Sequence, residues 1–133
     1  MTKTTVDHIV INISDENISK EFYSKILGFL GFKIVKESKI TESGRSFIGY
    51  GKDGVGVWLR KSVDVSKQQT YAGYNHIAFA AESRKQIIEL QNMLQKNNYK
   101  ILYRAGAHPE FAPTYYSISF FDPDGTVIEL VHR

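Results

Sequence analysis

The 133-residue chain contains no cysteine, and this absence excludes several kinds of site at once. Without thiols the protein can form no disulfide, no zinc-thiolate centre and no cysteine nucleophile. Any metal ion that it binds must therefore be held by histidine, aspartate or glutamate side chains.

Proline is scarce too, with three residues, and no proline-rich or low-complexity stretch marks a linker or a disordered segment. Nowhere do about 18 apolar residues follow one another, as a membrane-spanning helix requires. The opening segment MTKTTVDHIV lacks the apolar core of a secretion signal. We therefore expect a cytoplasmic protein that does not contact a membrane.

Positive charge is in modest excess, with a formal net charge of +3 and a pI of about 9.0. The basic residues do not cluster, because Glu37 interrupts the row Lys33, Lys36 and Lys39. We expect solvated faces rather than a nucleic-acid partner. The hydrophobic content of 42% is ordinary for one globular domain, which at this length buries about two thirds of its unfolded surface.

The first half of the chain predicts a strand, a helix and three further strands. In DHIVINIS, residues 7–14, Ile9, Ile11 and Ile13 share one face, which is the period of a strand with one dry side. A stretch with apolar residues every four positions follows and predicts a helix. The runs FKIVKES, RSFIGYG and VGVWLRK then have strand character.

The limits of the first helix are also predicted from particular residues. Ser14 or Asp15 is the expected N-cap, since both side chains can accept a hydrogen bond from the first turn. Gly28 and Gly31 are expected to end the helix.

The second half repeats this order. NHIAFAAES is another alternating strand, and Ser83 with Gln86 forms a capping-box pattern that opens a second helix. The strand-like runs YKILYRA, YYSISFF and TVIELVH follow. The last hairpin of each half turns at an Asp-Gly pair, Asp53-Gly54 and Asp124-Gly125.

The repeat predicts an α+β fold made of two β-α-β-β-β modules, residues 5–62 and 73–133, within a single domain. Each module is expected to bury one face of its sheet under its helix. The opposite faces are then expected to line a cup built from curved mixed sheets.

Three ionisable residues fall on the predicted cup face. His8 and His76 lie at equivalent strand starts, and Glu129 lies among apolar residues near the end of the last strand. A buried unpaired carboxylate is costly, so Glu129 needs a partner, a shifted pKa or a metal ion. Each residue alone is more often hydrogen-bonded than metal-bound. Their coincidence on one face favours a two-histidine, one-carboxylate centre that leaves open positions for a substrate.

The segments DHIVIN, FYSKILGF, NHIAFAAES and FFDPDGTVIELV resemble the vicinal oxygen chelate superfamily over nearly the whole chain. That superfamily contains glyoxalase I, fosfomycin-modifying enzymes, extradiol dioxygenases and bleomycin-binding proteins. The resemblance implies that the first and last strands of the modules carry the metal ligands, here His8, His76 and Glu129. It also implies a homodimer, in which His8 can reach the metal from a different chain than the other two ligands.

One position departs from the glyoxalase I pattern. Four residues after the turn glycine the second module has Glu129, whereas the first has Trp58. Enzymes of the glyoxalase I type that resemble this chain carry a glutamate ligand at the position of Trp58, and an indole can neither bind the metal nor move a proton. The departure leaves a three-ligand centre, like those of fosfomycin thiol transferases and dioxygenases.

The first interpretation is a glyoxalase-like lyase or isomerase that uses a divalent metal, Zn, Ni, Mn or Fe, and a small substrate that chelates it through vicinal oxygens. The alternatives are a fosfomycin-type thiol transferase, an extradiol-type dioxygenase and a non-catalytic small-molecule binding protein. The loop RAGAHPEFAPTYY has no cluster of basic residues for a phosphonate, dioxygenases are usually longer chains, and bleomycin-binding relatives lack the metal ligands.

Catalytic roles are predicted for Glu129 and for Tyr115, which leads into the cup-lining strand. The residues expected to contact the substrate are Trp58, Arg60, His108, Ser117 and Ser119. His108 stands in a loop, for which a surface position is the favoured interpretation and a lid that supplies an acid or base is the alternative. Gly49, Gly51 and Gly54 match G-x-G-x-x-G, but a strand follows them, so they are interpreted as hairpin glycines rather than a dinucleotide site.

Overall fold

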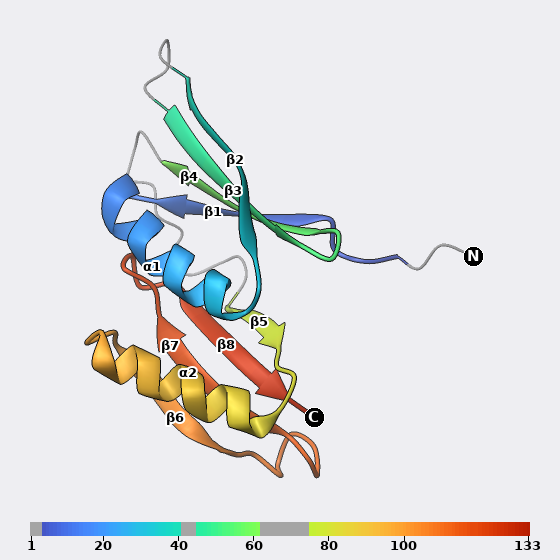
Figure 1. The fold of residues 1–133 in the computed structure, drawn as a ribbon. Coiled ribbons are helices and arrows are strands. Elements are labelled where there is room, and N and C mark those ends of the chain that lie inside the picture. Colours follow the sequence, from blue (N-terminus) through green and yellow to red (C-terminus); the bar gives the residue numbers. More distant parts are fainter. Residues whose placement is uncertain (1–3, 41–44, 62–74) are drawn as a thin grey trace. The chain divides into compact units, whose positions relative to one another are not determined.

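The computed structural model describes residues 4–40, 45–61 and 75–133. It divides the chain into two compact units, Met1–Gln68 and Gln69–Arg133. Each unit has the order strand, helix, strand, strand, strand, so the predicted fold of two β-α-β-β-β modules is confirmed (Figure 1). Within the described ranges, no helix has the length and apolar character needed to cross a membrane.

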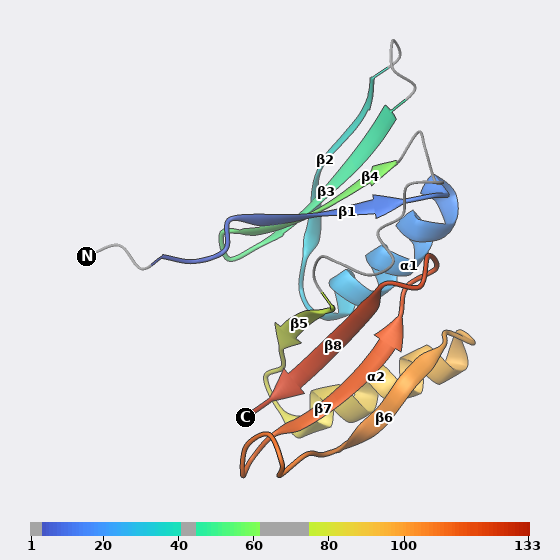
Figure 2. The same cartoon turned by 180° about the vertical axis from the view of Figure 1, so that it is seen from behind.

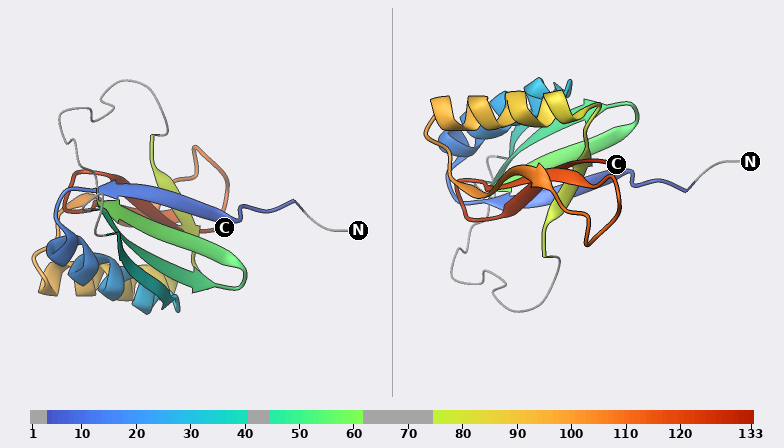
Figure 3. Two further views of the ribbon diagram at one scale, coloured as in Figure 1. Left: turned by 90° about the horizontal axis from the view of Figure 1, so that it is seen from above. Right: turned by 90° about the horizontal axis from the view of Figure 1, so that it is seen from below.

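The first unit is a mixed four-stranded sheet with one helix. Its sheet has the order β1-β4-β3-β2, and only the β1–β4 pair is parallel. Seen from above, α1 lies along one side of this sheet (Figure 3, left). The elements are β1 (His8–Ile13), α1 (Glu16–Phe29), β2 (Lys33–Ile40), β3 (Arg45–Lys52) and β4 (Val55–Lys61).

Helix α1 begins and ends at identifiable backbone signals. The Asp15 carboxylate caps it by accepting from the Ile18 amide at 2.9 Å, which selects Asp15 among the two predicted caps. At the other end, Gly31 has a φ of 91° and the Phe32 amide donates back to Leu27, as in a Schellman motif. The prediction that Gly28 also ends the helix is wrong, because α1 continues through Gly28 to Phe29.

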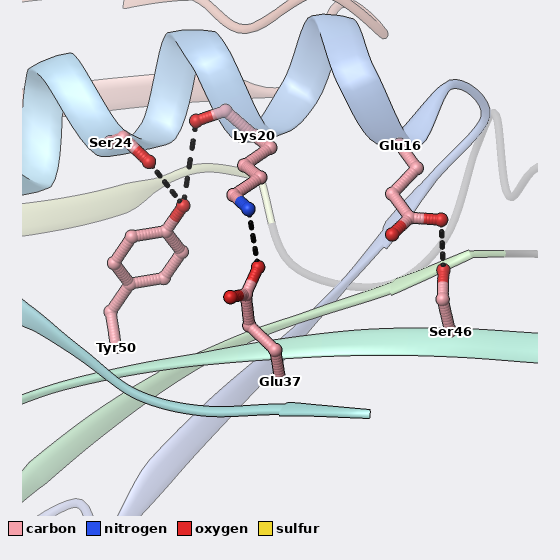
Figure 4. A network of polar contacts seen from close by, with 6 residues as sticks. All are labelled: Glu16, Lys20, Ser24, Glu37, Ser46 and Tyr50. Carbon is pink, nitrogen blue, oxygen red and sulfur yellow. Dashed lines mark hydrogen bonds and ion pairs between the residues drawn. The ribbon is translucent and has the colours of Figure 1, made fainter. Parts of the chain in front are cut away.

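The face of the first sheet that α1 covers is dry, as the alternation predicted. Its buried residues are Ile11, Ile13, Ile48, Tyr50, Val57 and Leu59, and those of the helix are Phe22, Tyr23, Ile26 and Leu27. Polar contacts hold the helix to β2 and β3 at the margin of this core (Figure 4).

In this polar margin, the Tyr50 hydroxyl shares a hydrogen bond of 2.8 Å with Ser24 Oγ and lies 3.5 Å from the Lys20 carbonyl oxygen. Lys20 also pairs with Glu37 of β2 (Figure 4). Burial is the main cause that raises the pKa of Tyr50 above its ordinary value.

The second unit repeats the arrangement with sheet order β5-β8-β7-β6, in which only β5 and β8 are parallel. Helix α2 lies in front of its strands in Figure 1 and behind them in Figure 2. Ser83 Oγ accepts from the Gln86 amide at 3.1 Å, which confirms the predicted cap. The elements are β5 (Ile77–Ala80), α2 (Arg84–Lys96), β6 (Ile101–Ala107), β7 (Tyr116–Phe121) and β8 (Val127–His132).

The hairpin turns of the two units differ, although sequence suggested that they correspond. Asp53 and Gly54 both have positive φ, 50° and 80°, as a two-residue type I′ turn requires. In the second unit the Asp122 carboxylate accepts from the amides of Asp124 and Thr126, and the connection runs from residue 122 to 126. The expected equivalence of the turns is therefore wrong in geometry, because a buried side chain organises the second loop.

Each sheet also has a face opposite its own helix, called here the open face. On the first sheet the register pairs His8 with Gly56, and Val10 with Trp58, on this face. On the second sheet it pairs Glu129 with Ala78 and with Ser119. The open faces therefore carry the predicted site residues His8, Trp58 and Glu129.

Candidate functional site

Glu129 is the centre of the candidate site in the second unit. It lies in the middle of β8 and is 6% exposed. One carboxylate oxygen, Oε2, lies 2.9 Å from Nε2 of His76, and the other, Oε1, accepts a hydrogen bond of 2.6 Å from the Tyr115 hydroxyl. Both oxygens are thus engaged, which offsets the cost of burying the charge. The structure brings three of the predicted site residues together.

His76 immediately precedes β5 and is held on its other ring nitrogen. Its Nδ1 lies 2.9 Å from Oδ1 of Asn75. Because an amide oxygen only accepts, Nδ1 carries the hydrogen, and the Nε2 contact with Glu129 requires a proton or a cation between the two atoms. Two donor atoms bound to one ion at about 2.0–2.2 Å lie about 3 Å apart when they are at right angles, so this pair fits a metal ion.

His8 shows the same local arrangement in the first unit. Its Nδ1 lies 2.6 Å from Oδ1 of Asp7, and half of its side chain is exposed. Ligating histidines commonly donate their second nitrogen to a carboxylate or carbonyl, which orients the ring. The roles of Asp7 and Asn75 were missed by the sequence analysis, although the dipeptides Asp-His and Asn-His, one in each module, were the available signal.

Tyr115 stands just before β7 and is enclosed by aromatic and basic groups. The ring of Phe111 lies 5.4 Å from it at 72°, and the Arg133 guanidinium lies 5.2 Å above it. The hydrogen bond to Glu129 is the main cause that raises the pKa of Tyr115, followed by burial. Tyr115 is therefore a neutral hydrogen-bond donor at ordinary pH.

The loop between β6 and β7 places His108 in this aromatic cluster rather than on the carboxylate. Its ring lies 5.7 Å from that of Phe111 and 6.3 Å from that of Tyr115. Its Nδ1 lies 3.1 Å from Oε1 of Glu110. A backbone hydrogen bond, and then His108, lower the pKa of Glu110. His108 thus contacts Tyr115, and Phe111 joins the set without having been predicted.

Ser117 and Ser119 lie on the same face as Glu129. Ser119 is its direct neighbour across the β7–β8 ladder, and Ser117 pairs with Val131 two residues further along β8. Ser117 is buried and Ser119 is partly exposed. Both serines therefore lie on the open face, with Ser119 directly across from Glu129 and Ser117 diagonal to it.

Trp58 occupies the position in the first unit that Glu129 occupies in the second. Each pairs with the residue two places after the histidine of its unit, Trp58 with Val10 and Glu129 with Ala78. A hollow of about 410 Å³ on this unit has both His8 and Trp58 in its lining. Arg60 lies two residues further along β4, is exposed and does not line the hollow.

The described residues hold no group of three or more histidine, aspartate and glutamate side chains arranged to take a metal ion. In the second unit the group consists of His76 and Glu129, with Tyr115 as a hydrogen-bond donor. That set can hold a proton or share a cation. The membership of His8 in the same centre stays a prediction.

Comparison with known proteins places these features in a family context. The chain is 32% identical to the uncharacterized protein YqjT of Bacillus subtilis (strain 168), over 93% of this chain and 95% of that protein. It is 28% identical to the metallothiol transferase FosB of Staphylococcus epidermidis (strain ATCC 12228 / FDA PCI 1200), over 98% and 82%. It is also 28% identical to the lactoylglutathione lyase of Escherichia coli O157:H7, over 95% and 90%.

The fold has close counterparts among solved structures. The glyoxylase/bleomycin resistance protein/dioxygenase domain from Frankia sp. EAN1pec superposes with a TM-score of 0.79 at 20% identity, over 98% of both chains. The profile of the Glyoxalase/Bleomycin resistance protein/Dioxygenase superfamily matches residues 5–130. Because the profile matches almost the whole chain, this protein belongs to the Glyoxalase/Bleomycin resistance protein/Dioxygenase superfamily.

Proposed function

We propose that the protein is a divalent-metal-dependent enzyme of the glyoxalase-like type that acts on a small substrate with vicinal oxygens. His8, His76 and Glu129 are the proposed metal ligands. The observation that carries the proposal is the 2.9 Å contact between His76 Nε2 and a carboxylate oxygen of the buried Glu129.

The shared setting of the two histidines supports a common role. In each unit a side-chain oxygen of the preceding residue, Asp7 or Asn75, holds Nδ1. This leaves Nε2 as the atom that each ring can offer to an ion. A divalent ion bound there would act as a Lewis acid on a substrate oxygen.

Tyr115 has two roles in the proposed site. Its hydroxyl holds Oε1 of Glu129, which orients the carboxylate so that Oε2 faces His76. The same hydroxyl is a neutral proton donor beside the position of the substrate, where Ser119 offers a second hydroxyl from β7.

Lyase or isomerase chemistry is the first assignment and thiol transfer to an epoxide is the second. Similarity to a lactoylglutathione lyase and to a metallothiol transferase is equal at 28% identity, so identity does not separate them. Trp58 in place of a carboxylate supports a three-ligand centre. Zn, Ni, Mn and Fe are the candidate metals, and the protein is proposed to work in the cytoplasm as a homodimer.

Metal content tests the site. Glu129→Gln and His76→Ala are expected to lose most of the bound metal that the wild-type protein carries after purification or after loading with Zn²⁺, Ni²⁺, Mn²⁺ or Fe²⁺. The measurement is elemental analysis together with calorimetric titration of each metal. His108→Ala is the matched control, because this histidine is outside the proposed ligand set. Unchanged metal content in both ligand variants would refute the proposed centre.

Turnover assays then separate the reaction classes. Methylglyoxal hemithioacetal tests the isomerase, fosfomycin with a low-molecular-weight thiol tests the transferase, and oxygen uptake with catechol tests ring cleavage. Ligand binding without turnover of any of them would favour the binding-protein alternative.

A further inference from the structure

On the open face of the first sheet, glycines occupy positions that carry side chains on the second sheet. Gly49 pairs with Trp58, and Gly51 pairs with Gly56, which in turn pairs with His8. When Trp58 is aligned with Glu129, the positions of these glycines in the second sheet are occupied by side chains. They are Ser119 for Gly49, Phe121 for Gly51 and Val127 for Gly56. The hollow beside His8 arises from this missing side-chain layer.

The indole of Trp58 lies against two of these glycines. A Cβ added to Gly49 would lie 2.7 Å from Cζ3 and 2.8 Å from Cε3 of the indole. A Cβ added to Gly56 would lie 2.9 Å from the indole Nε1 and 3.0 Å from Cβ of His8. Opposite edges of the ring thus lie against two neighbouring strands, so one face of the indole lies on the backbone. The ring of Phe47 lies 5.6 Å from the indole, tilted by 52°.

The hollow is open to solvent and is bordered by side chains on two sides. Val35 of β2 borders it, since its Cγ1 would lie 3.2 Å from a Cβ on Gly51, and His8 borders it on the other side of the glycine pair. The volume of about 410 Å³ lies within the range of small-molecule sites, about 300–1,000 Å³. The lining combines the apolar side chains of Val35 and Trp58 with the polar residues Asp7, His8, Lys52 and Asp53.

We propose that this hollow binds a planar, aromatic or conjugated part of the substrate, stacked on the indole of Trp58, and that Trp58 determines specificity for flat molecules. Two aromatic rings that stack gain free energy beyond that of the apolar area they bury, and a saturated ring lacks this additional gain. That this ligand is the substrate of the proposed reaction rests on the proposed function. That the hollow binds planar rings rests on the first unit alone.

The single tryptophan of the chain makes the hollow directly observable. Metal-stripped protein, kept in chelator, is titrated with catechol and with cis-1,2-cyclohexanediol while tryptophan fluorescence is excited at the red edge of its absorption. We expect saturable quenching by catechol and binding of the saturated diol that is weaker by about two- to tenfold, the range that stacking contributes. Equal affinity for the two diols, or absence of saturable quenching, would overturn the proposal.

Glycine variants test the geometry while the reporter is kept. Gly49→Ala and Gly56→Ala should each displace the indole, which changes the near-ultraviolet circular dichroism and weakens catechol binding. Gly28→Ala is the matched control, because nothing lies within 4 Å of an added Cβ at that position. If the indole signal and the affinity stay unchanged in both glycine variants, the stacked geometry is wrong.

Direct substitution covers the case in which an alanine variant does not fold. Calorimetric titration of Trp58→Leu should show catechol affinity reduced by about two- to tenfold, and Trp58→Phe, which keeps an aromatic face, should lie between it and the wild type. Catechol affinity that exists only in metal-loaded protein would contradict the hollow and leave the metal centre in place. Binding to stripped protein combined with unaltered metal content in the ligand variants would support the hollow and refute the metal centre.

Discussion

The two units are built alike and diverge on their open faces. Both have the same element order, and the same ladder position holds Trp58 in one and Glu129 in the other. In the first unit, glycines let an indole lie on the backbone. In the second, the two oxygens of the Glu129 carboxylate contact the imidazole of His76 and the phenol of Tyr115. The comparison teaches that a repeated scaffold offers equivalent positions, whereas the residues across the ladder decide what each position can do.

The largest effect on stability is expected in the second unit, at the hydrogen bond between Tyr115 and the buried Glu129. Tyr115→Phe removes the hydroxyl that holds Oε1 of the buried Glu129, so an acceptor is left without its partner. We expect the free energy of unfolding to fall by about 1–3 kcal/mol, measured by urea denaturation. Tyr103→Phe is the control, because Tyr103 is 63% exposed, and it should change little. Equal effects of the two substitutions would show that the phenol does not support the carboxylate.

A second difference lies beneath the helices, where Tyr50 of the first sheet corresponds to Phe120 of the second. Tyr50 pairs with Val57, the residue before Trp58, and Phe120 pairs with Ile128, the residue before Glu129. Loss of the hydroxyl in Tyr50→Phe removes the contacts with Ser24 and Lys20. We expect a cost of about 0.5–1.5 kcal/mol at neutral pH, measured by urea denaturation.

The same variant has a distinct pH dependence. The folded state raises the pKa of Tyr50 above its unfolded value, mainly by burial. Above about pH 10 the unfolded phenol ionises while the folded one stays neutral, so wild-type stability is retained below that pH and lost as the pH rises through the folded pKa. Tyr50→Phe should therefore lose less stability between neutral and strongly alkaline pH. Parallel curves for the two proteins would argue against this role of Tyr50.

A third difference lies at the helix ends, where the two units place different residues in the left-handed conformation. Gly31 after α1 and Asn98 after α2 both have positive φ, 91° and 57°. Gly31→Ala is expected to cost about 1–2 kcal/mol at most, since it places a side chain in the left-handed region, whereas Asn98→Gly should gain less than about 1 kcal/mol. Thermal unfolding of both variants measures the signs, and two changes of the same sign would break the comparison.

Much of the fold was predictable because it depends on local period and capping. The alternation in DHIVINIS and NHIAFAAES correctly assigned the buried and open faces, and the caps at Asp15 and Ser83 were among those predicted. Gly28 was misassigned because a helix tolerates glycine, and its end is set by the positive φ of Gly31. The Asp-Gly pair at residue 124 was misjudged because the Asp122 carboxylate, rather than the dipeptide, shapes that loop.

The candidate site was predictable in its members and not in its contacts. Strand parity identified His76 and Glu129 as residues of one face, and the ladder shows Trp58 at the counted equivalent position. Parity cannot show which oxygen of Glu129 meets which partner, or that Asp7 and Asn75 hold the imidazoles, because those contacts depend on side-chain rotamers. It also gave no account of Phe111, which reaches Tyr115 from a loop without periodic pattern.

Residue types and their spacing along the chain were enough to predict the repeated order of strands and helices, the dry and open faces, and the exclusion of thiol chemistry. The contacts of Glu129 with His76 and Tyr115, and of Trp58 with Gly49 and Gly56, emerge only in the folded chain. Both sets of contacts form between residues of different strands and loops, where register and rotamer bring together atoms whose proximity no local pattern encodes.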